Sequence, residues 1–182
     1  MNNITNIFSV GISSYQTHGI KNDEIVKFIE ENPCIDHSPK NLRTILNDNL
    51  FEDLNNLVTE KVNDYYHSIY NNKFKCRLIR AWHNHGNEKY IIEPHHHNQS
   101  FISAVYYPEA SDAQIVFMNP NAILNAHQTD DMIGDCNPYN SVLYRLPIKT
   151  GELVIFNSML DHYITFSKNK RMSIAYDAVV VK

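Results

Sequence analysis

The sequence is poor in cysteine and has no long apolar run. Its three cysteines, Cys34, Cys76 and Cys136, lie far apart and form no Cys-x-x-Cys pair. This spacing argues against a disulfide framework or a cysteine zinc ribbon and favours a reducing compartment, for which we predict the cytoplasm. No apolar segment approaches the roughly 18 residues of a membrane span. Residues 1–6 lack a charged region followed by an apolar one, so we expect neither a signal peptide nor a membrane partner.

Positive charge is also scarce. Sixteen Lys and Arg residues face twenty Asp and Glu residues, and the formal net charge is −4. The chain therefore offers no electrostatic reason to expect nucleic acid as a partner. It has neither an internal repeat nor a low-complexity segment. A length of 182 residues with 43% hydrophobic residues suits a single domain, residues 1–182, with a core of its own.

The N-terminal part, about residues 20–72, is predicted to be helical. Asn22 is a suitable N-cap for a short helix that must end before Pro33, and residues 33–46 are polar and irregular. From about residue 48 to 71, apolar residues recur at spacings of three and four, which indicates a long amphipathic helix packed on a sheet. These apolar residues are Leu50, Leu54, Leu57, Val58, Val62, Tyr65 and Ile69.

The rest of the chain has the alternation typical of short β-strands. One strand is expected within residues 4–15, chiefly 7–12. Others are expected at 74–82, 90–97, 101–107, 115–118, 142–147, 152–156, 163–166 and 172–181, with turns or loops at 83–88 and 119–141. Helices followed by about eight strands indicate an α+β fold with a sandwich or barrel of sheets over about residues 73–182.

Histidine is the unusual component of the composition. Of ten histidines, five fall between His83 and His97. Alternate side chains of an extended chain share a face, so His95 and His97 point one way and His96 the other. Two such imidazoles form half of a metal site, and His162, which follows another strand, is the candidate third ligand. The bland alternative is a surface run of histidines that binds metals only adventitiously.

Arg171 and Ser173 share a face of the last strand by the same alternation. A buried Arg is costly without an anion, and its planar fork fits a carboxylate. Beside a histidine metal site, this pair is suited to bind a carboxylate ligand. The alternative for Arg171 is a surface ion pair, and Tyr107 and Trp82 are open to a reading as plain core residues. The string His83-Asn84-His85 reads as a coincidence in a turn.

The order and spacing of these residues resemble the Fe(II)/2-oxoglutarate-dependent dioxygenases. The pattern is His-x-His…Ser-x-x-Ser-Ala-Val-Tyr-Tyr…Gly-x-Leu-x-x-Phe…His…Arg-x-Ser-Ile-Ala, over about residues 76–181. It is closest to a branch of small phage and bacterial members related to prolyl hydroxylases. The resemblance implies a double-stranded β-helix, or jelly roll, with the N-terminal helices packed on one sheet.

The resemblance also implies roles for individual residues. His95, His97 and His162 would hold Fe(II), and Arg171 would pair with the distal carboxylate of 2-oxoglutarate. Tyr107 matches a tyrosine that hydrogen-bonds this carboxylate in prolyl hydroxylases, and Ser173 matches the serine of the Arg-x-Ser pair in other members. His83 lies about where prolyl hydroxylases carry a pocket tyrosine.

One departure concerns the second position of the motif. Most of the superfamily has His-x-Asp or His-x-Glu, so that two histidines and one carboxylate hold the metal. This chain has His97 there, as is usual in the small branch that it resembles. Glu93 on the same strand face, or Asp161 beside His162, could supply a carboxylate instead.

The leading prediction is a non-haem iron oxygenase that couples oxidative decarboxylation of 2-oxoglutarate to hydroxylation of an unidentified substrate, with O2 as the other partner. One alternative is a cupin-like three-histidine metal enzyme without 2-oxoglutarate, and another is a non-enzymatic jelly-roll binding module. Selectivity is expected in the loop 119–141 and the N-terminal segment. A homodimer is compatible with the sequence. The 23 asparagines favour an AT-rich genome such as that of a phage, in which case the compartment is the host cytoplasm.

Overall fold

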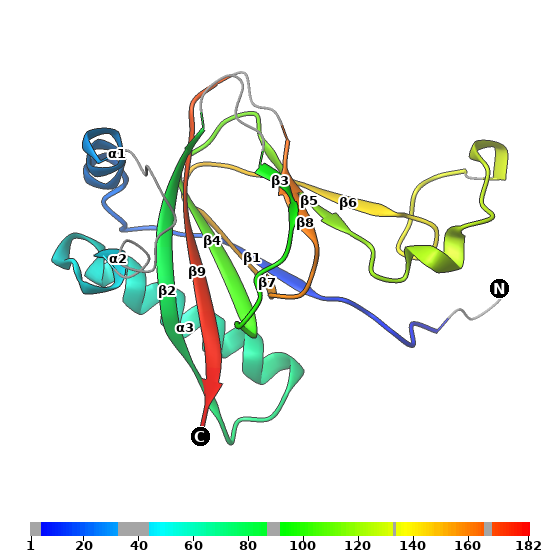
Figure 1. Ribbon diagram of the computed structural model, residues 1–182, viewed down its shortest axis with the longest axis horizontal. Coiled ribbons are helices and arrows are strands. Elements are labelled where there is room, and N and C mark those ends of the chain that lie inside the picture. The colour runs from blue at the N-terminus through cyan, green and yellow to red at the C-terminus, as the bar shows by residue number, and fades with distance from the viewer. Residues whose placement is uncertain (1–4, 33–43, 87–91, 133, 166–168) are drawn as a thin grey trace.

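A computed structural model describes residues 5–32, 44–86, 92–132, 134–165 and 169–182 (Figure 1). The helices are α1 (Asn22–Glu31), α2 (Thr44–Asn47) and α3 (Glu52–Ile69), with 3-10 turns η2 (Asn49–Phe51), η3 (Ala122–Asn125) and η4 (Asp130–Met132). The strands are β1 (Ile12–Gln16), β2 (Lys75–Gly86), β3 (Ile92–His95), β4 (Ile102–Glu109), β5 (Gln114–Met118), β6 (Leu143–Pro147), β7 (Glu152–Asn157), β8 (His162–Ile164) and β9 (Arg171–Val181).

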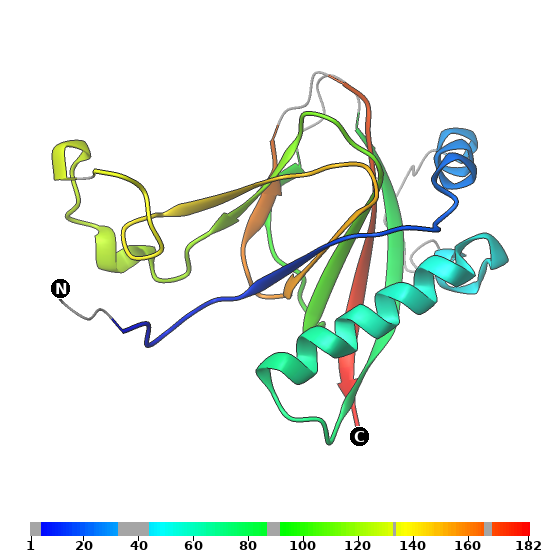
Figure 2. The same cartoon turned by 180° about the vertical axis from the view of Figure 1, so that it is seen from behind.

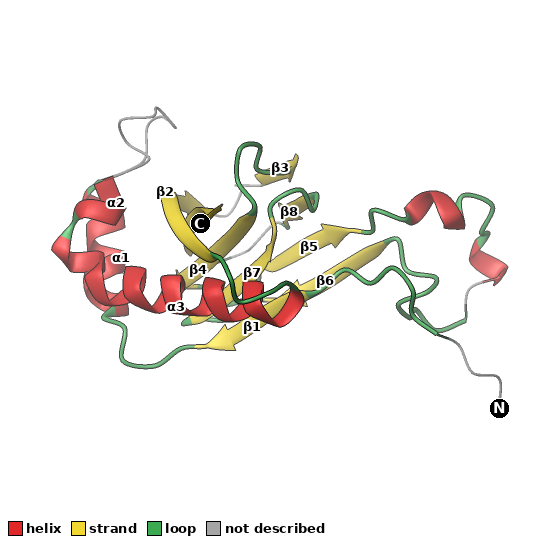
Figure 3. Ribbon diagram, turned by 90° about the horizontal axis from the view of Figure 1, so that it is seen from below, coloured by secondary structure: helices red, strands yellow, loops and turns green. Residues whose placement is uncertain are grey.

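The strands form two facing sheets. The large sheet has the order β1-β7-β4-β9-β2 and the small sheet the order β3-β8-β5-β6, with antiparallel pairing throughout. The helices cover one face of the large sheet, and the small sheet lies over its other face (Figures 1 and 3). This arrangement agrees with the predicted α+β jelly roll with N-terminal helices on one sheet.

Two apolar clusters follow from these layers. The first lies between the helices and the large sheet, and the second lies between the two sheets. Helix α3, which runs across the large sheet in Figure 2, contributes Leu54, Val58 and Val62 to the first cluster, as its spacing of three and four predicts. Tyr65 and Tyr66 are both buried there, at 5% exposed each.

Strand β9 has one face in each layer. Its even-numbered residues, such as Met172, Ile174 and Tyr176, belong to the cluster beneath the helices. Its odd-numbered residues, such as Ser173 and Ala175, face the space between the sheets. Because these residues are buried, the strand reads as a nearly continuous apolar run, interrupted by the buried polar residues Arg171, Ser173 and Asp177.

A bulge in β2 sets which of its side chains face the same space. Leu78 pairs with Ala178 and Arg80 with Asp177, so Ile79 is an extra residue on β2. In a regular strand, Leu78 and Arg80 lie two residues apart and would share a face. Because of the bulge, Leu78 packs against the cluster beneath the helices, whereas Arg80 faces the space between the sheets.

The predicted element boundaries need four corrections. The first strand begins at Ile12, so the expected strand over 7–12 is wrong for 7–11, where the described chain is not paired. Residues 44–46 were expected to be irregular and belong to α2. The predicted turn at 83–88 is wrong for 83–86, which continue β2 in register with β9. The strand expected up to residue 97 ends at His95. Residues 33–43, 87–88, 90–91, 133 and 166 of the predicted segments, and Cys34, lie outside the described residues.

An arm extends from the small sheet. Strands β5 and β6 pair from Gln114–Pro147 to Met118–Leu143, and the segment between them, with η3 and η4, projects away from the two sheets (Figure 1). Among the described residues, no helix is long and apolar enough to span a membrane.

Candidate functional site

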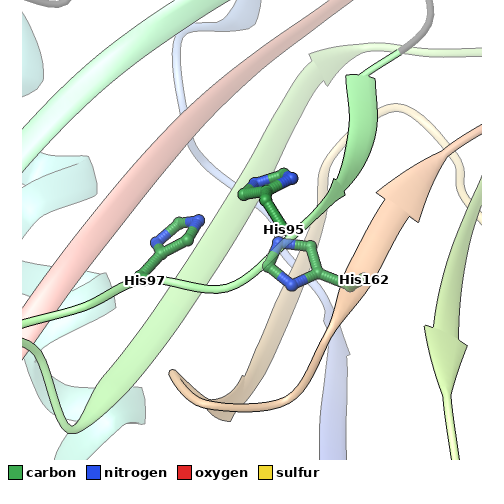
Figure 4. A group of neighbouring side chains, drawn as sticks. All are labelled: His95, His97 and His162. Atoms are coloured by element: carbon green, nitrogen blue, oxygen red, sulfur yellow. The ribbon is translucent and has the colours of Figure 1, made fainter.

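Three histidines meet between the sheets at one end of the small sheet (Figure 4). His95 ends β3 and His162 begins β8, and the two residues are direct partners across these strands. His97 follows β3, where its backbone N–H donates to the carbonyl oxygen of Ser158 at 2.9 Å. One ligand atom from each of the three side chains lies within 4.8 Å of the other two. Residues from two distant segments are thus brought to one point.

All three rings are held through the same nitrogen. His95 Nδ1 lies 2.7 Å from the carbonyl oxygen of Glu93, and His162 Nδ1 lies 2.9 Å from that of Leu160. His97 Nδ1 lies 2.7 Å from a carboxylate oxygen of Asp177. An acceptor at Nδ1 fixes the proton there, which leaves Nε2 of each ring with a free lone pair. This is the state in which imidazole binds a metal.

Burial favours the neutral form of His95 and His162. Desolvation lowers the pKa of His162 to about 3, and the neighbouring His95 and His97 add to the effect. Desolvation also lowers the pKa of His95, with smaller contributions of the same sign from His97 and His96. Neutral imidazoles are the form that a divalent cation requires, so the donor set fits a metal.

His95 and His97 lie together as predicted, but not because they share a strand face. Strand β3 ends at His95, and His97 lies in the segment that follows. The two carboxylates left open as ligands are not part of the cluster: among the described residues, the group of possible ligands holds only the three histidines. Glu93 is exposed, and Asp161 accepts from His96 Nδ1 at 2.8 Å. His96 is exposed, as expected.

Arg171 is buried, at 1% exposed, at the start of β9. Its Nη1 lies 3.4 Å from the hydroxyl oxygen of Ser173. A Cβ placed on Gly86, its partner on β2, would lie 2.7 Å from Nη2 of Arg171, so the guanidinium lies close against the backbone of β2 at this glycine. The guanidinium therefore lies between the sheets and not on the surface.

Tyr107 lies on the neighbouring strand β4 and is also fully buried. Its hydroxyl has no hydrogen-bond partner among the described residues. Burial raises the pKa of Tyr107, while the nearby Arg171 works in the opposite direction. A neutral buried hydroxyl without a partner costs free energy unless a ligand supplies one.

A cavity of about 740 Å³ lies beside the three histidines. Its wall is formed by β3 and the segment that follows it, residues 92–99, and by residues of β2, β4, β5, β8 and β9, including His162, Ser173 and Ala175. Arg171 and Tyr107 do not line it and lie further along the same strands, beyond Ser173.

Strand β2 places Arg80, Trp82 and Asn84 on the cavity wall. The expectation that His83 lines the pocket is wrong, because its ring packs edge-on against Phe28 of α1, with 6.0 Å between ring centroids. Trp82, which was open to a reading as core, lines the cavity with its ring 5.3 Å from that of His97. The bulge at Ile79 explains these positions.

The sequence reasoning missed Asp177. Its carboxylate is fully buried and contacts both His97 and Arg80. Burial would raise its pKa, but the hydrogen bond from His97 and the charge of Arg80 prevail and lower it. The signal was available, since the alternation that joins Arg171 and Ser173 also includes position 177.

Comparison with protein families agrees with this geometry. Residues 80–177, more than half of the chain, match the family described as "Putative 2OG-Fe(II) oxygenase". The chain belongs to this family. It is therefore a 2-oxoglutarate-dependent Fe(II) oxygenase, with iron and 2-oxoglutarate as its cofactor and cosubstrate, and the cupin-like and non-enzymatic alternatives are set aside. No curated protein matches the chain.

Solved structures share the fold at low identity. An oxidoreductase of the 2OG-Fe(II) oxygenase family from Burkholderia pseudomallei has 13% identity and a TM-score of 0.51, covering 73% of this chain. The present chain spans 59% of the length of that protein. HygX from Streptomyces hygroscopicus, crystallised with nickel and 2-oxoglutarate, has 10% identity and a TM-score of 0.58 over 93% of this chain and 82% of its own. A prolyl-4-hydroxylase from Pseudomonas putida has 13% identity and a TM-score of 0.60 over 94% and 87%.

Proposed function

We propose that His95, His97 and His162 hold Fe(II) through their Nε2 atoms in this oxygenase. The observation that carries the proposal is the shared hydrogen bonding of the three rings, each with an acceptor at Nδ1 and each in one cluster of ligand atoms. The bound iron supplies the redox chemistry that couples oxidative decarboxylation of 2-oxoglutarate to oxidation of a substrate.

Arg171, Tyr107 and Ser173 are proposed to bind the distal carboxylate of 2-oxoglutarate. Support comes from the buried guanidinium beside the Ser173 hydroxyl and from the buried Tyr107 hydroxyl that has no partner among the described residues. A bidentate guanidinium and a hydroxyl donor suit a carboxylate in a dry site. The cosubstrate would lie along β9, with its other end at the histidines.

The remaining partners are also proposals. O2 is the second cosubstrate, and the reaction hydroxylates an organic substrate that enters through the cavity. Both described cysteines are free, Cys76 buried and Cys136 exposed, which suits the reducing cytoplasm. A homodimer remains compatible with the chain.

An anaerobic titration tests the proposed function. Protein made without a histidine tag, given Fe(II) and then 2-oxoglutarate, should develop a visible metal-to-ligand absorption band, and exposure to O2 should yield succinate without added substrate. His162→Gln and His97→Gln should lose the band.

His96→Gln is the matched control, because His96 lies between two proposed ligands in the sequence but pairs with Asp161 and is not part of the ligand cluster. It should keep both the band and succinate formation. An equal loss in His96→Gln and His97→Gln, or no band and no succinate with the unsubstituted protein, would contradict the proposal.

A further inference from the structure

The three proposed ligands differ in what accepts their Nδ1 proton. Backbone carbonyl oxygens serve His95 and His162, whereas a carboxylate serves His97. This carboxylate belongs to Asp177, which is fully buried, at 0% exposed. A buried carboxylate is expensive unless it is fully paired, so its position calls for a physical reason.

Asp177 is held by four side chains. Oδ1 accepts from His97 Nδ1 at 2.7 Å, from the Ser103 hydroxyl at 3.0 Å and from the Ser100 hydroxyl at 3.2 Å. Oδ2 lies 2.5 Å from Nη2 of Arg80. The carboxylate therefore has little freedom to turn toward a cation at the histidines.

The fold fixes this arrangement through strand register. Arg80 and Asp177 are direct partners across β2 and β9. Asp177 faces the cavity by the alternation of β9, and Arg80 does so because of the bulge at Ile79. Arg80 Nη2 also donates to the carbonyl oxygen of Asn98 at 3.0 Å, in the segment that carries His97. The Ser103 hydroxyl lies 3.1 Å from His97 Nδ1 and 2.9 Å from the Ser158 hydroxyl. His97 is thus held by its ring and by its backbone.

We propose that Asp177 is a positioning residue that holds His97 in the Nδ1–H tautomer, with Nε2 turned to the metal, and that Arg80 keeps its carboxylate from becoming a ligand. The proposal rests on the proposed function. The His-x-His motif has no carboxylate at its second position. In this chain a carboxylate is present nearby, but it contacts Nδ1 of His97 and does not itself bind the metal. Partners of this kind orient a ligating histidine and raise its basicity.

Two measurements test this without relying on turnover. The first uses ¹⁵N-histidine NMR of the metal-free protein, with His97 assigned by His97→Gln. His97 should carry its proton on Nδ1. A proton on Nε2 in the unsubstituted protein would overturn the proposal, and this result needs no variant of Asp177.

The second is a Co(II) titration followed by visible absorption, without 2-oxoglutarate. Asp177→Asn keeps the shape of the side chain but replaces one carboxylate oxygen by an NH2 group, which must point toward either His97 or Arg80. The Nδ1–H tautomer of His97 thereby loses its carboxylate acceptor. We expect Co(II) affinity to fall by about ten- to a hundredfold, together with a shift of His97 toward the Nε2–H tautomer.

Asp161→Asn is the matched control, since Asp161 pairs with an exposed histidine outside the cluster. It should leave Co(II) affinity and the tautomer of His97 unchanged. Wild-type affinity in Asp177→Asn with His97 still protonated on Nδ1, or an equal loss in Asp161→Asn, would overturn the inference and leave the proposed function standing. No Co(II) binding by the unsubstituted protein would overturn both.

Discussion

At the scale of single residues, the proposed cosubstrate site contains polar groups that are buried before any ligand binds. Tyr107 is the clearest of these, because its hydroxyl lies in the interior with no partner among the described residues. Tyr106, the next residue, points to the opposite face of β4 and donates its hydroxyl to Asn22 Oδ1 at 2.6 Å. The fold supplies an acceptor for the Tyr106 hydroxyl but, among the described residues, none for the Tyr107 hydroxyl.

Replacing Tyr107 by Phe should separate binding from folding. We expect the free energy of unfolding of the ligand-free protein to stay the same or rise by about 1 kcal/mol, because an unsatisfied buried hydroxyl is removed. Affinity for 2-oxoglutarate should fall by about tenfold, since a hydrogen bond to a charged group is lost. Denaturant unfolding and the anaerobic absorption titration measure the two effects.

Tyr106→Phe is the control for this comparison. It loses a hydrogen bond of the fold, so it should be less stable by about 1 kcal/mol with unchanged 2-oxoglutarate affinity. If Tyr107→Phe instead destabilises the protein and leaves the affinity intact, the hydroxyl has a structural role.

At the scale of elements, one face of β9 lines the cavity and its other face packs beneath the helices. Ser173 lies on the cavity wall, and Ile174 is fully buried beneath the helices. Adjacent residues of one strand should therefore respond differently to truncation. Strand β2 also has one face on the cavity, because the bulge after Leu78 turns Arg80, Trp82 and Asn84 toward it.

Ser173→Ala and Ile174→Ala test this division. Ile174→Ala removes buried apolar volume and should cost about 2–5 kcal/mol of stability with little change in 2-oxoglutarate affinity. Ser173→Ala should weaken 2-oxoglutarate several-fold and change stability by less than about 1 kcal/mol. Thermal unfolding and cosubstrate titration distinguish them, and a reversal of the two patterns would refute the assignment of the faces.

Alternation along strands was the part of the structure that the sequence made predictable. It placed Arg171 and Ser173 on one face, and the same rule reaches Asp177. The bulge at Ile79 was not predictable, because an extra residue leaves no mark on composition or hydrophobicity. The prediction placed His83 at the pocket by resemblance to prolyl hydroxylases, whereas the structure places Asn84 on the cavity wall.

His162 was predicted as the third ligand because it follows another strand, and the family resemblance implied the same set of histidines. Their pairing depends on the register of β3 and β8, which sequence periodicity alone does not determine. The roles of the three histidines and of Arg171, Tyr107 and Ser173 stay predictions that the experiments above address. The phage origin and the single domain over residues 1–182 also stay predictions.

At the scale of the whole molecule, the arm between β5 and β6 is separate from the proposed chemistry. None of its described residues between Asn119 and Val142 lines the cavity. Several of its apolar side chains are exposed, with Ile123 and Leu124 at 79% each. The prediction that this loop governs selectivity stays untested.

Replacing residues 120–141 by Asn-Gly should shorten the arm to a two-residue hairpin, because Met118 and Leu143 already pair. We expect Fe(II) and 2-oxoglutarate to bind within about twofold of the original affinity, since no cavity wall is removed. Circular dichroism verifies the fold, and the absorption titration measures binding. A folded variant that binds no cosubstrate would show that the arm supports the site.

The central claim is that distant segments converge on one cation, with a guanidinium placed for the cosubstrate. A crystal structure prepared anaerobically with Fe(II) and 2-oxoglutarate tests it most directly. We predict iron on Nε2 of His95, His97 and His162, and the distal carboxylate on Arg171 and Tyr107. Iron bound by Glu93 or Asp161 in place of His97, or a cosubstrate whose carboxylates both lie away from Arg171, would contradict the account.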